Sequence, residues 1–542
     1  MSIRWAAWGE EAFARGRVER KPLLLSLTAS WCYACHRMND ETWEDPGIAA
    51  AVERATVPVR VDADARPDVY GRYHLGGLPT TALLTPAGDF VSGGTFLLPP
   101  QFLAFLERGL ADFAAGRRPG LRAPQSPARP ARLVDAMVAL LSRRADPEHG
   151  GFGAAPKLPE VEAVTLLLRE WRAGGHEALK GIVSASLDAI ARHLYDARDG
   201  GFFRYAAGAD WAGPHTEKVA VDQAQLVRLF VEAGVALGEP RYALAGRHAL
   251  AHARRRLADE AGRVWASIAA DPDYYEASRG DRERAMPAVD QRRFADAAAA
   301  MAAADRLVFA TTGVETGFQR EFIAAAPSGC VPHRLDAAEG PSGLLRDQAL
   351  AIAAAVADYR LGGDGALLEW AKRAADWSLA RLWNPAASAF SAAPESAGEG
   401  LRLTPMFPLT GNGEMALALA ELACHTAEPG YSAAGEAAIT ALSAEAARRP
   451  AGAALALAAQ RLEREPAQAE LAGQPGDPRA RALARVVVAA LGPTAVVSWT
   501  GGVEPGLTLC VRELCLPPFA DPRELMDAIV DIGLAPPGAN PS

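Results

Sequence analysis

The sequence predicts a multidomain protein: an N-terminal α/β domain, then a large all-α ring, then a small C-terminal α/β segment. The chain has 542 residues, and a single hydrophobic core stops growing economically at about 250–300 residues, so more than one domain is expected. Short apolar runs separated by turn residues dominate the beginning of the chain, whereas helical periodicity dominates later. Half of the residues are hydrophobic and 7% are aromatic, which favours closely packed helices.

The composition also limits the classes of partner. A formal net charge of −9, with no basic stripe, argues against nucleic acid or an anionic membrane as the main partner. The sequence contains no segment long and apolar enough to span a membrane, and its N-terminal residues lack the apolar core of a signal peptide. We therefore expect a cytoplasmic protein that binds neither nucleic acid nor membrane.

The first domain is predicted to cover residues 1–115, where helices alternate with strands and a hairpin closes the series. A turn at 86–89 separates the last two strands, as its Pro-Ala-Gly-Asp sequence indicates. This order is typical of a thioredoxin-like α/β sheet. The predicted elements are a helix over 8–17, strands over 23–27, 57–62 and 81–85, and a final strand from 90.

Two cysteines, Cys32 and Cys35, lie between the first predicted strand and the following helix. Thiols three residues apart can close a disulfide or remain side by side as thiol and thiolate. Because the N-terminus of a helix stabilises negative charge, Cys32 is expected to be the more acidic and more nucleophilic of the two. The pair is the clearest chemical signal in the sequence.

Three other interpretations compete with redox chemistry at this pair. The run from Cys32 to His36 fits the c-type haem attachment pattern, but that chemistry normally requires export and leaves Pro79 unexplained. A zinc site would need two further ligands, for which His36 and His74 are available. The third is a redox-inactive fold used for docking. We predict the redox function, with no metal and no cofactor.

The sequence around the pair resembles thioredoxin. Trp31 precedes Cys32, and Pro79 follows forty-seven residues after that cysteine. The resemblance implies that Pro79 is cis, packs beside the disulfide and presents a backbone edge to the substrate. It also implies that Cys32 is the attacking thiol and Cys35 the resolving one.

The whole domain further resembles the thioredoxin-like domain of the spermatogenesis-associated protein 20 family. This chain departs from the pattern twice: Tyr33 replaces the histidine that the family usually has after the first cysteine, and Ser26 replaces the buried aspartate of thioredoxins. A proton relay through that aspartate is therefore absent. The matching segments are 35–38, 41–45, 61–62, 66–69, 76–79, 84–88 and 93–96.

Residues 116–130 are rich in proline, glycine and arginine and predict a linker. Apolar periodicity then predicts twelve helices over 131–465. Short turns follow the even helices and longer loops follow the odd ones, in a unit of roughly fifty to sixty residues. Six such helix hairpins predict a closed ring, an (α/α)6 toroid.

Three of the even helices are predicted to begin with the same dipeptide, Asp-Gln, at Asp222, Asp290 and Asp347. In an alternating ring these carboxylates would converge on one mouth and form a polar pocket for a hydroxyl-rich compound. The alternative is that each aspartate is a routine N-cap.

The resemblance to the same family extends into the ring, through 150–159, 200–205 and 211–224. In that family a domain similar to six-hairpin glycosidases and N-acylglucosamine 2-epimerases follows the thioredoxin-like one. The densest polar cluster here is His215, Glu217, Lys218 and Asp222. A histidine and a glutamate can exchange protons with a sugar, although a network that only braces the loop is the alternative.

Residues 466–542 predict a small α/β segment, with a helix over 480–491 and strands over 495–499 and 507–511. Cys510 and Cys515 are expected to be buried cysteines, with a dithiol as the alternative.

The primary functional prediction is thiol–disulfide chemistry with a protein partner. A sugar-binding or epimerase-like toroid with a carbohydrate ligand, and a non-catalytic scaffold in which both sites have decayed, are the alternatives.

Overall fold

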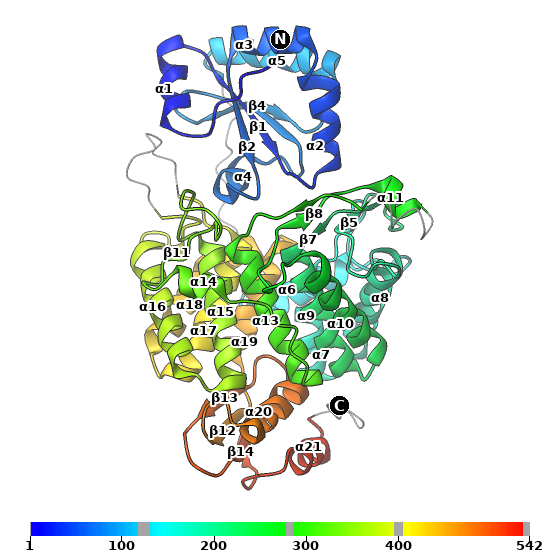
Figure 1. The fold of residues 1–542 in the computed structure, drawn as a ribbon, viewed down its shortest axis with the longest axis vertical. Helices are drawn as coiled ribbons and strands as arrows, with labels where there is room; N and C mark the ends of the chain where they lie inside the picture. The colour runs from blue at the N-terminus through cyan, green and yellow to red at the C-terminus, as the bar shows by residue number, and fades with distance from the viewer. Residues whose placement is uncertain (1, 118–128, 278–285, 395–404, 535–542) are drawn as a thin grey trace. The chain divides into compact units, whose positions relative to one another are not determined.

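The computed structural model describes residues 2–117, 129–277, 286–394 and 405–534 (Figure 1). Most of the predicted linker, residues 118–128, lies outside the described residues. The chain divides into two compact units. Unit 1 comprises Met1–Gln125, Ala269–Asp271 and Ala393–Met406, and unit 2 comprises Ser126–Ile268, Pro272–Ala392 and Phe407–Ser542.

Unit 1 is built on a four-stranded sheet of order β2-β1-β3-β4. β1 runs parallel to β2 and antiparallel to β3, and β4 runs antiparallel to β3. This mixed sheet with helices on both faces confirms the predicted thioredoxin-like fold. The strands are β1 (Leu23–Thr28), β2 (Val57–Asp62), β3 (Thr80–Leu84) and β4 (Phe90–Gly94).

The alternation of side chains along β1 divides the core of unit 1 into two layers. Leu25 and its alternate neighbours pack with α1 and α4, whereas Leu24 packs with η1, α3 and α5. Ser26 is buried on the same face as Leu24. The helices are α1 (Glu10–Glu19), α2 (Tyr33–Met38), the π-helix η1 (Asn39–Trp43), α3 (Pro46–Ala55), α4 (Pro67–Tyr73) and α5 (Pro99–Ala114).

Among its described residues, unit 2 contains a closed ring of six inner helices, in which each contacts the next and α19 contacts α7. Six outer helices alternate with them along the chain, so the predicted (α/α)6 toroid is confirmed. The inner helices are α7 (Val161–Gly174), α9 (Ala220–Leu237), α13 (Ala295–Thr312), α15 (Leu345–Gly362), α17 (Leu409–Thr426) and α19 (Ala453–Glu463). The outer helices are α6 (Leu133–Arg144), α8 (Glu177–His193), α10 (Pro240–Arg256), α14 (Glu321–Ala325), α16 (Gly365–Arg381) and α18 (Pro429–Ala446).

Alanine-rich sequences explain why the inner helices pack so closely. An inner helix has neighbours on nearly every side, so it must carry small or apolar residues around most of its circumference. In α13 the whole run from Ala297 to Ala304 is buried. The long loops precede the inner helices, and two of these long loops each carry a short hairpin. The hairpins are β5 (Tyr205–Ala206) with β6 (Pro214–His215), and β10 (Trp383–Asn384) with β11 (Ala389–Phe390).

A small α/β segment packs against the C-terminal halves of the inner helices, where α20 contacts α13 and α15, and β13 contacts α15 and α17. Figure 1 shows it at the end of the ring opposite the short strands β7 (Lys218–Val219) and β8 (Ser267–Ile268). Its sheet has the order β13-β12-β14-β15. Its elements are β12 (Gln468–Ala472), α20 (Pro478–Leu491), β13 (Val496–Trp499), β14 (Gly506–Val511), β15 (Leu514–Cys515) and α21 (Pro522–Asp531).

The prediction that Cys510 and Cys515 are buried cysteines is wrong. The two residues face each other across the β14–β15 hairpin and form a disulfide, and Cys515 is exposed. The two-residue turn between the strands, in which Arg512 has a φ of 53°, brings the cysteines into register.

Among the described helices, none has the length and hydropathy needed to cross a membrane.

Candidate functional site

The cysteine pair of unit 1 lies where β1 ends and the chain turns into α2. Cys32 is the N-cap residue of α2, and its Sγ accepts a hydrogen bond of 3.1 Å from the backbone N–H of Cys35. Both side chains are only 5% exposed, and the two form a disulfide. After reduction, the same N–H group would stabilise a thiolate on Cys32.

Pro79 lies next to this turn. The Leu78–Pro79 peptide bond is cis, and the register of β1 with β3 pairs Leu27 with Thr80. The antiparallel register therefore places Pro79 beside the end of β1 from which the chain continues to Cys32. Gly76, with a φ of 92°, and the hydroxyl of Thr80, which donates a 2.7 Å hydrogen bond to the carbonyl of Gly77, shape the preceding turn.

Two side chains flank the pair, Trp31 and Tyr33. The indole N–H of Trp31 donates a 2.8 Å hydrogen bond to the carboxylate of Asp64, which orients the buried ring beside Cys32. Sequence reasoning missed Asp64 because it lies beyond β2, far along the chain from the cysteines. Tyr33 is 48% exposed and therefore sits on the surface next to Cys32.

The zinc alternative finds no support in the described part of the chain. No set of histidine, aspartate or glutamate side chains there completes a metal-binding group with Cys32 and Cys35. His36, one of the two ligands considered from sequence, is exposed.

In unit 2, the glutamine of the repeated Asp-Gln dipeptide has a structural role, because its side-chain amide binds the loop before the helix. The fourth residue of three inner helices inserts its side-chain amide into the preceding loop, where the amide donates to a backbone carbonyl and accepts from a backbone N–H group. Gln223 makes both bonds to Phe202, and Asn412 makes both to Phe390. Gln348 accepts from the N–H of Val331 and donates to the carbonyl of Gly329.

The prediction that Asp290 begins a helix is wrong. Asp290 ends the short strand β9 (Val289–Asp290), and α13 begins only at Ala295. Its carboxylate binds the guanidinium of Arg292, with 3.0 Å between Oδ1 and Nε. The first turn of α13 carries Asp296 instead.

Lys218 is a brace under a loop. It is fully buried in β7 (Lys218–Val219), and its Nζ lies 2.9 Å from a carboxylate oxygen of Asp196 and 2.6 Å from the carbonyl oxygen of Gly200. Lys157 repeats the arrangement with Asp146 and the carbonyl of Gly150. The sequence Gly-Gly-Phe occurs in both loops, at 150–152 and 200–202, and each loop is thus held by a buried lysine. Burial lowers the pKa of Lys218 to about 8.

Glu217 and Asp222 meet at Arg204. The guanidinium lies 3.9 Å from Glu217 Oε1 and 3.4 Å from Asp222 Oδ2. The ring of His215, in β6, stacks on Tyr205, which follows Arg204, with 4.0 Å between the ring centroids. Burial raises the pKa of Glu217 to about 7, and no described residue gives its Oε2 a hydrogen bond. Three of the predicted pocket residues, His215, Glu217 and Asp222, therefore lie around Arg204 and Tyr205.

Asp347 belongs to a second cluster, with His333 and Asp296. The buried carboxylate of Asp347 lies 3.0 Å from Nδ1 of His333, and the potential ligand atoms of the three residues all lie within 4.8 Å of one another. Carboxylates with an imidazole could hold a divalent metal ion. The sequence did not predict this group because His333 lies in a loop without a ligand-spacing motif.

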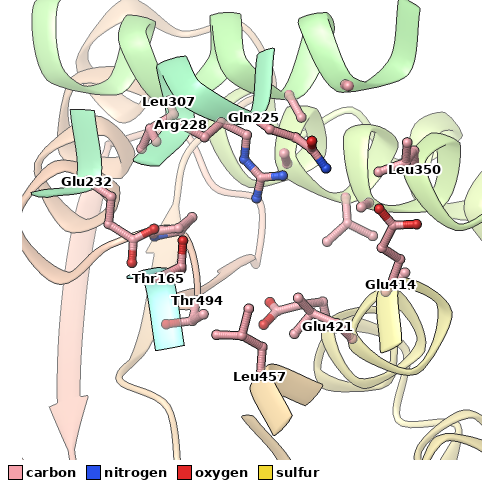
Figure 2. Close-up of a pocket in the computed structure, with 18 of the residues that line it drawn as sticks. Thr165, Gln225, Arg228, Glu232, Leu307, Leu350, Glu414, Glu421, Leu457 and Thr494 are labelled. Carbon is pink, nitrogen blue, oxygen red and sulfur yellow. The ribbon is translucent and has the colours of Figure 1, made fainter. Parts of the chain in front are cut away.

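The inner helices enclose a cavity of about 160 Å³, the lumen, which Figure 2 shows in close-up. All six contribute to its lining, and Val488, Pro493 and Thr494 of the C-terminal segment line the end near the helix C-termini. Sequence reasoning missed its charged side chains, although a charge inside an apolar helix, such as Arg228 between Val227 and Leu229, was an available signal. The charged lining residues are Glu162, Arg169, Arg228, Glu232, Arg306, Arg360, Glu414 and Glu421.

Comparison with known proteins gives two kinds of match. Residues 1–108 match the family Thioredox_DsbH, described as a protein of unknown function, DUF255. The chain is 27% identical to spermatogenesis-associated protein 20 of Mus musculus over 306 residues, which cover 50% of this chain and 39% of that protein. The match thus spans well under half of the relative's length.

Solved structures with similar folds include a sugar epimerase from a ruminal bacterium, which is 11% identical, has a TM-score of 0.46, and matches 56% of this chain and 83% of its own. A thioredoxin from Thermus thermophilus is 26% identical, with a TM-score of 0.20, over 23% of this chain and 99% of its own. The fold assignment rests on the sheet order and helix ring described above. The predicted relationship to the spermatogenesis-associated protein 20 family is confirmed: this chain is a relative of those proteins.

Proposed function

We propose that unit 1 is a thiol–disulfide oxidoreductase that acts on a protein thiol or disulfide through Cys32 and Cys35. One observation carries the proposal: Cys32 caps α2 with its sulfur on the Cys35 N–H group, beside a cis-proline at position 79. A capped thiolate is the nucleophile of disulfide exchange.

In the reducing direction, the Cys32 thiolate attacks one sulfur of a substrate disulfide. A mixed disulfide forms and the first substrate thiolate leaves. The Cys35 thiolate then attacks Cys32 Sγ, which releases the second substrate thiolate and closes the Cys32–Cys35 disulfide. The substrate gains two electrons and the pair loses two. The reverse sequence oxidises a dithiol.

Ser26 affects the second step. It is buried on the face of β1 that packs with α3 and α5, and the resemblance to thioredoxin implies that a carboxylate at this position would accept the proton of the resolving thiol. A hydroxyl is a poor base at neutral pH, so Cys35 must lose its proton by another route.

Equilibration in glutathione buffers tests the proposal. The Cys32–Cys35 pair is expected to convert reversibly between disulfide and dithiol, as measured by alkylation and mass spectrometry of the intact chain. A pair that does not exchange would contradict the proposal.

A second function is proposed for unit 2: binding of a small hydroxylated compound of the carbohydrate class, with Glu217 as a proton-transfer group. The observation that favours it is the buried Glu217 carboxyl, whose pKa of about 7 suits an acid or base near neutral pH. Its premise is that this carboxyl is largely neutral in the folded chain.

That premise gives a pH-dependent stability. A carboxyl whose pKa rises from 4.5 to about 7 on folding binds more protons folded than unfolded between these values. The stability of unit 2 is therefore expected to fall as pH rises through this window, by up to about 3 kcal/mol for such a group. Glu414, whose pKa burial also raises to about 7, adds to the slope.

The measurement is urea unfolding at several pH values, followed by helical circular dichroism. Glu217→Gln should flatten the slope, and the exposed Glu148→Gln should leave it unchanged. An identical slope in the wild type and Glu217→Gln would refute a buried neutral carboxyl.

A further inference from the structure

Arg228 differs from the other arginines of the lumen because it pairs with no carboxylate among the described residues. Arg169 binds Glu232, with 2.7 Å between Nε and Oε1, and both Arg360 and Arg461 bind Glu421. Figure 2 shows the guanidinium of Arg228 extending from α9 into the cavity, apart from the carboxylates of the lining. It is thus a cation that faces the cavity without a carboxylate beside it.

The helix termini do not explain its position. Arginines near helix C-termini are stabilised by the carbonyl groups there. Arg172 binds the carbonyl oxygen of Ala490 and Arg360 that of Pro493, so these two have backbone partners. Arg228 lies in the middle of α9, which continues to Leu237, and the favourable field of a helix end is confined to the last turn.

An unpaired arginine in such a place is costly. Burial disfavours its charged form and lowers the pKa of Arg228, although a guanidinium stays charged near neutral pH. A partly desolvated charge without an ion-pair partner destabilises the fold, whereas apolar or neutral residues would fill the same space without that penalty. A bound anion would supply the missing partner.

The pairing of charges around the lumen singles out Arg228. The lining has as many glutamates as arginines, four of each. Three of these arginines form ion pairs, Arg169 with Glu232, Arg306 with Asp305 and Arg360 with Glu421. Within the described part of the chain Arg228 forms none, so a bound anion would supply its partner.

We infer that Arg228 binds the anionic group of a small ligand, a carboxylate or a phosphate, inside the lumen of unit 2. The planar guanidinium can engage either group with two parallel hydrogen bonds. Thr165, Gln225 and Thr494 line the same cavity and offer neutral polar contacts to hydroxyl groups. The cavity volume of about 160 Å³ would hold on the order of ten waters, so a small organic acid or phosphate ester fits.

This inference concerns unit 2 and is independent of the chemistry of Cys32 and Cys35. The test titrates the intact chain with D-gluconate, with inorganic phosphate and, as an uncharged comparison, with D-glucose. Calorimetry and the unfolding temperature report binding. At least one of the two anions is expected to bind more tightly than D-glucose and to lose affinity as salt rises. A response to D-gluconate alone indicates a carboxylate, and a response to phosphate alone indicates a phosphate.

Two variants sharpen the test. Arg228→Gln is expected to weaken anion binding at least about tenfold, because a charge-assisted bidentate contact is lost. Without ligand, the same variant is expected to unfold at a higher temperature, since a partly desolvated charge without an ion-pair partner is removed from the lumen. Arg247→Gln, on the exposed side of α10, should change neither quantity. Failure of both anions to bind the wild type, or equal binding to Arg228→Gln, would overturn the inference.

Discussion

A chain carrying Cys35→Ser is expected to accumulate mixed disulfides with its partners, whereas a chain carrying Cys32→Ser accumulates none. Cys32 caps α2 and forms the first bond with the substrate, and Cys35 breaks that bond. Without Cys35 the intermediate persists, and at least about tenfold more trapped product is expected than for Cys32→Ser. Non-reducing electrophoresis followed by mass spectrometry of the adducts measures the difference.

The comparison needs a background without other reactive thiols. Cys424 is exposed and Cys330 is half-buried, and both are free in the structure, so both are replaced by serine. Retention of adducts by Cys35→Ser in this background assigns them to Cys32. Equal amounts of adduct in the two variants would mean that Cys32 and Cys35 do not have the proposed division of roles.

Replacing Lys218 by methionine is expected to destabilise unit 2 by about 3–5 kcal/mol, because the buried carboxylate of Asp196 would lose its cation. The carbonyl of Gly200 would lose its hydrogen bond in the same step. The loop held by this lysine leads to Glu217, so the local geometry of the mouth should loosen as well. Urea unfolding of the intact chain measures the loss.

A double variant separates the ion pair from packing. Lys218→Met combined with Asp196→Leu removes both charges and is expected to recover much of the lost stability, as is usual for buried pairs replaced by apolar residues. Lys372→Met breaks a partly exposed pair with Glu369 on α16 and should cost about 0–1 kcal/mol. If Lys218→Met lowers the free energy of unfolding no more than Lys372→Met does, the proposed structural role of Lys218 is wrong.

Local signals made the fold predictable. The strand of leucines before Cys32, the turn at Pro86 and the helical periodicity after residue 131 each depend on neighbours in sequence. The disulfide between Cys510 and Cys515 was missed because it depends on the strand register across a two-residue turn, which the residue types alone did not define.

The site residues of unit 2 were harder to predict for a physical reason. The Asp-Gln repeat did mark structurally equivalent positions in two inner helices. However, the side chains that bind the preceding loops are the amides of Gln223 and Gln348, not the aspartates. Asp290 belongs to the same dipeptide but does not begin a helix. The lumen depends on which face of each helix points inward and on pairs far apart in the chain, such as Arg169 with Glu232. Apolar periodicity predicts where helices lie, but it does not predict which charged side chains on different helices form ion pairs.

The central claim is that Cys32 and Cys35 form a redox-active pair. The most direct measurement is the fraction of their disulfide at equilibrium across a series of glutathione buffers, in a chain carrying Cys510→Ser and Cys515→Ser so that no second disulfide responds. We expect a single reversible two-electron transition, absent from the Cys32→Ser chain. A pair that remains fully oxidised or fully reduced across the whole series, from either starting state, would contradict the account.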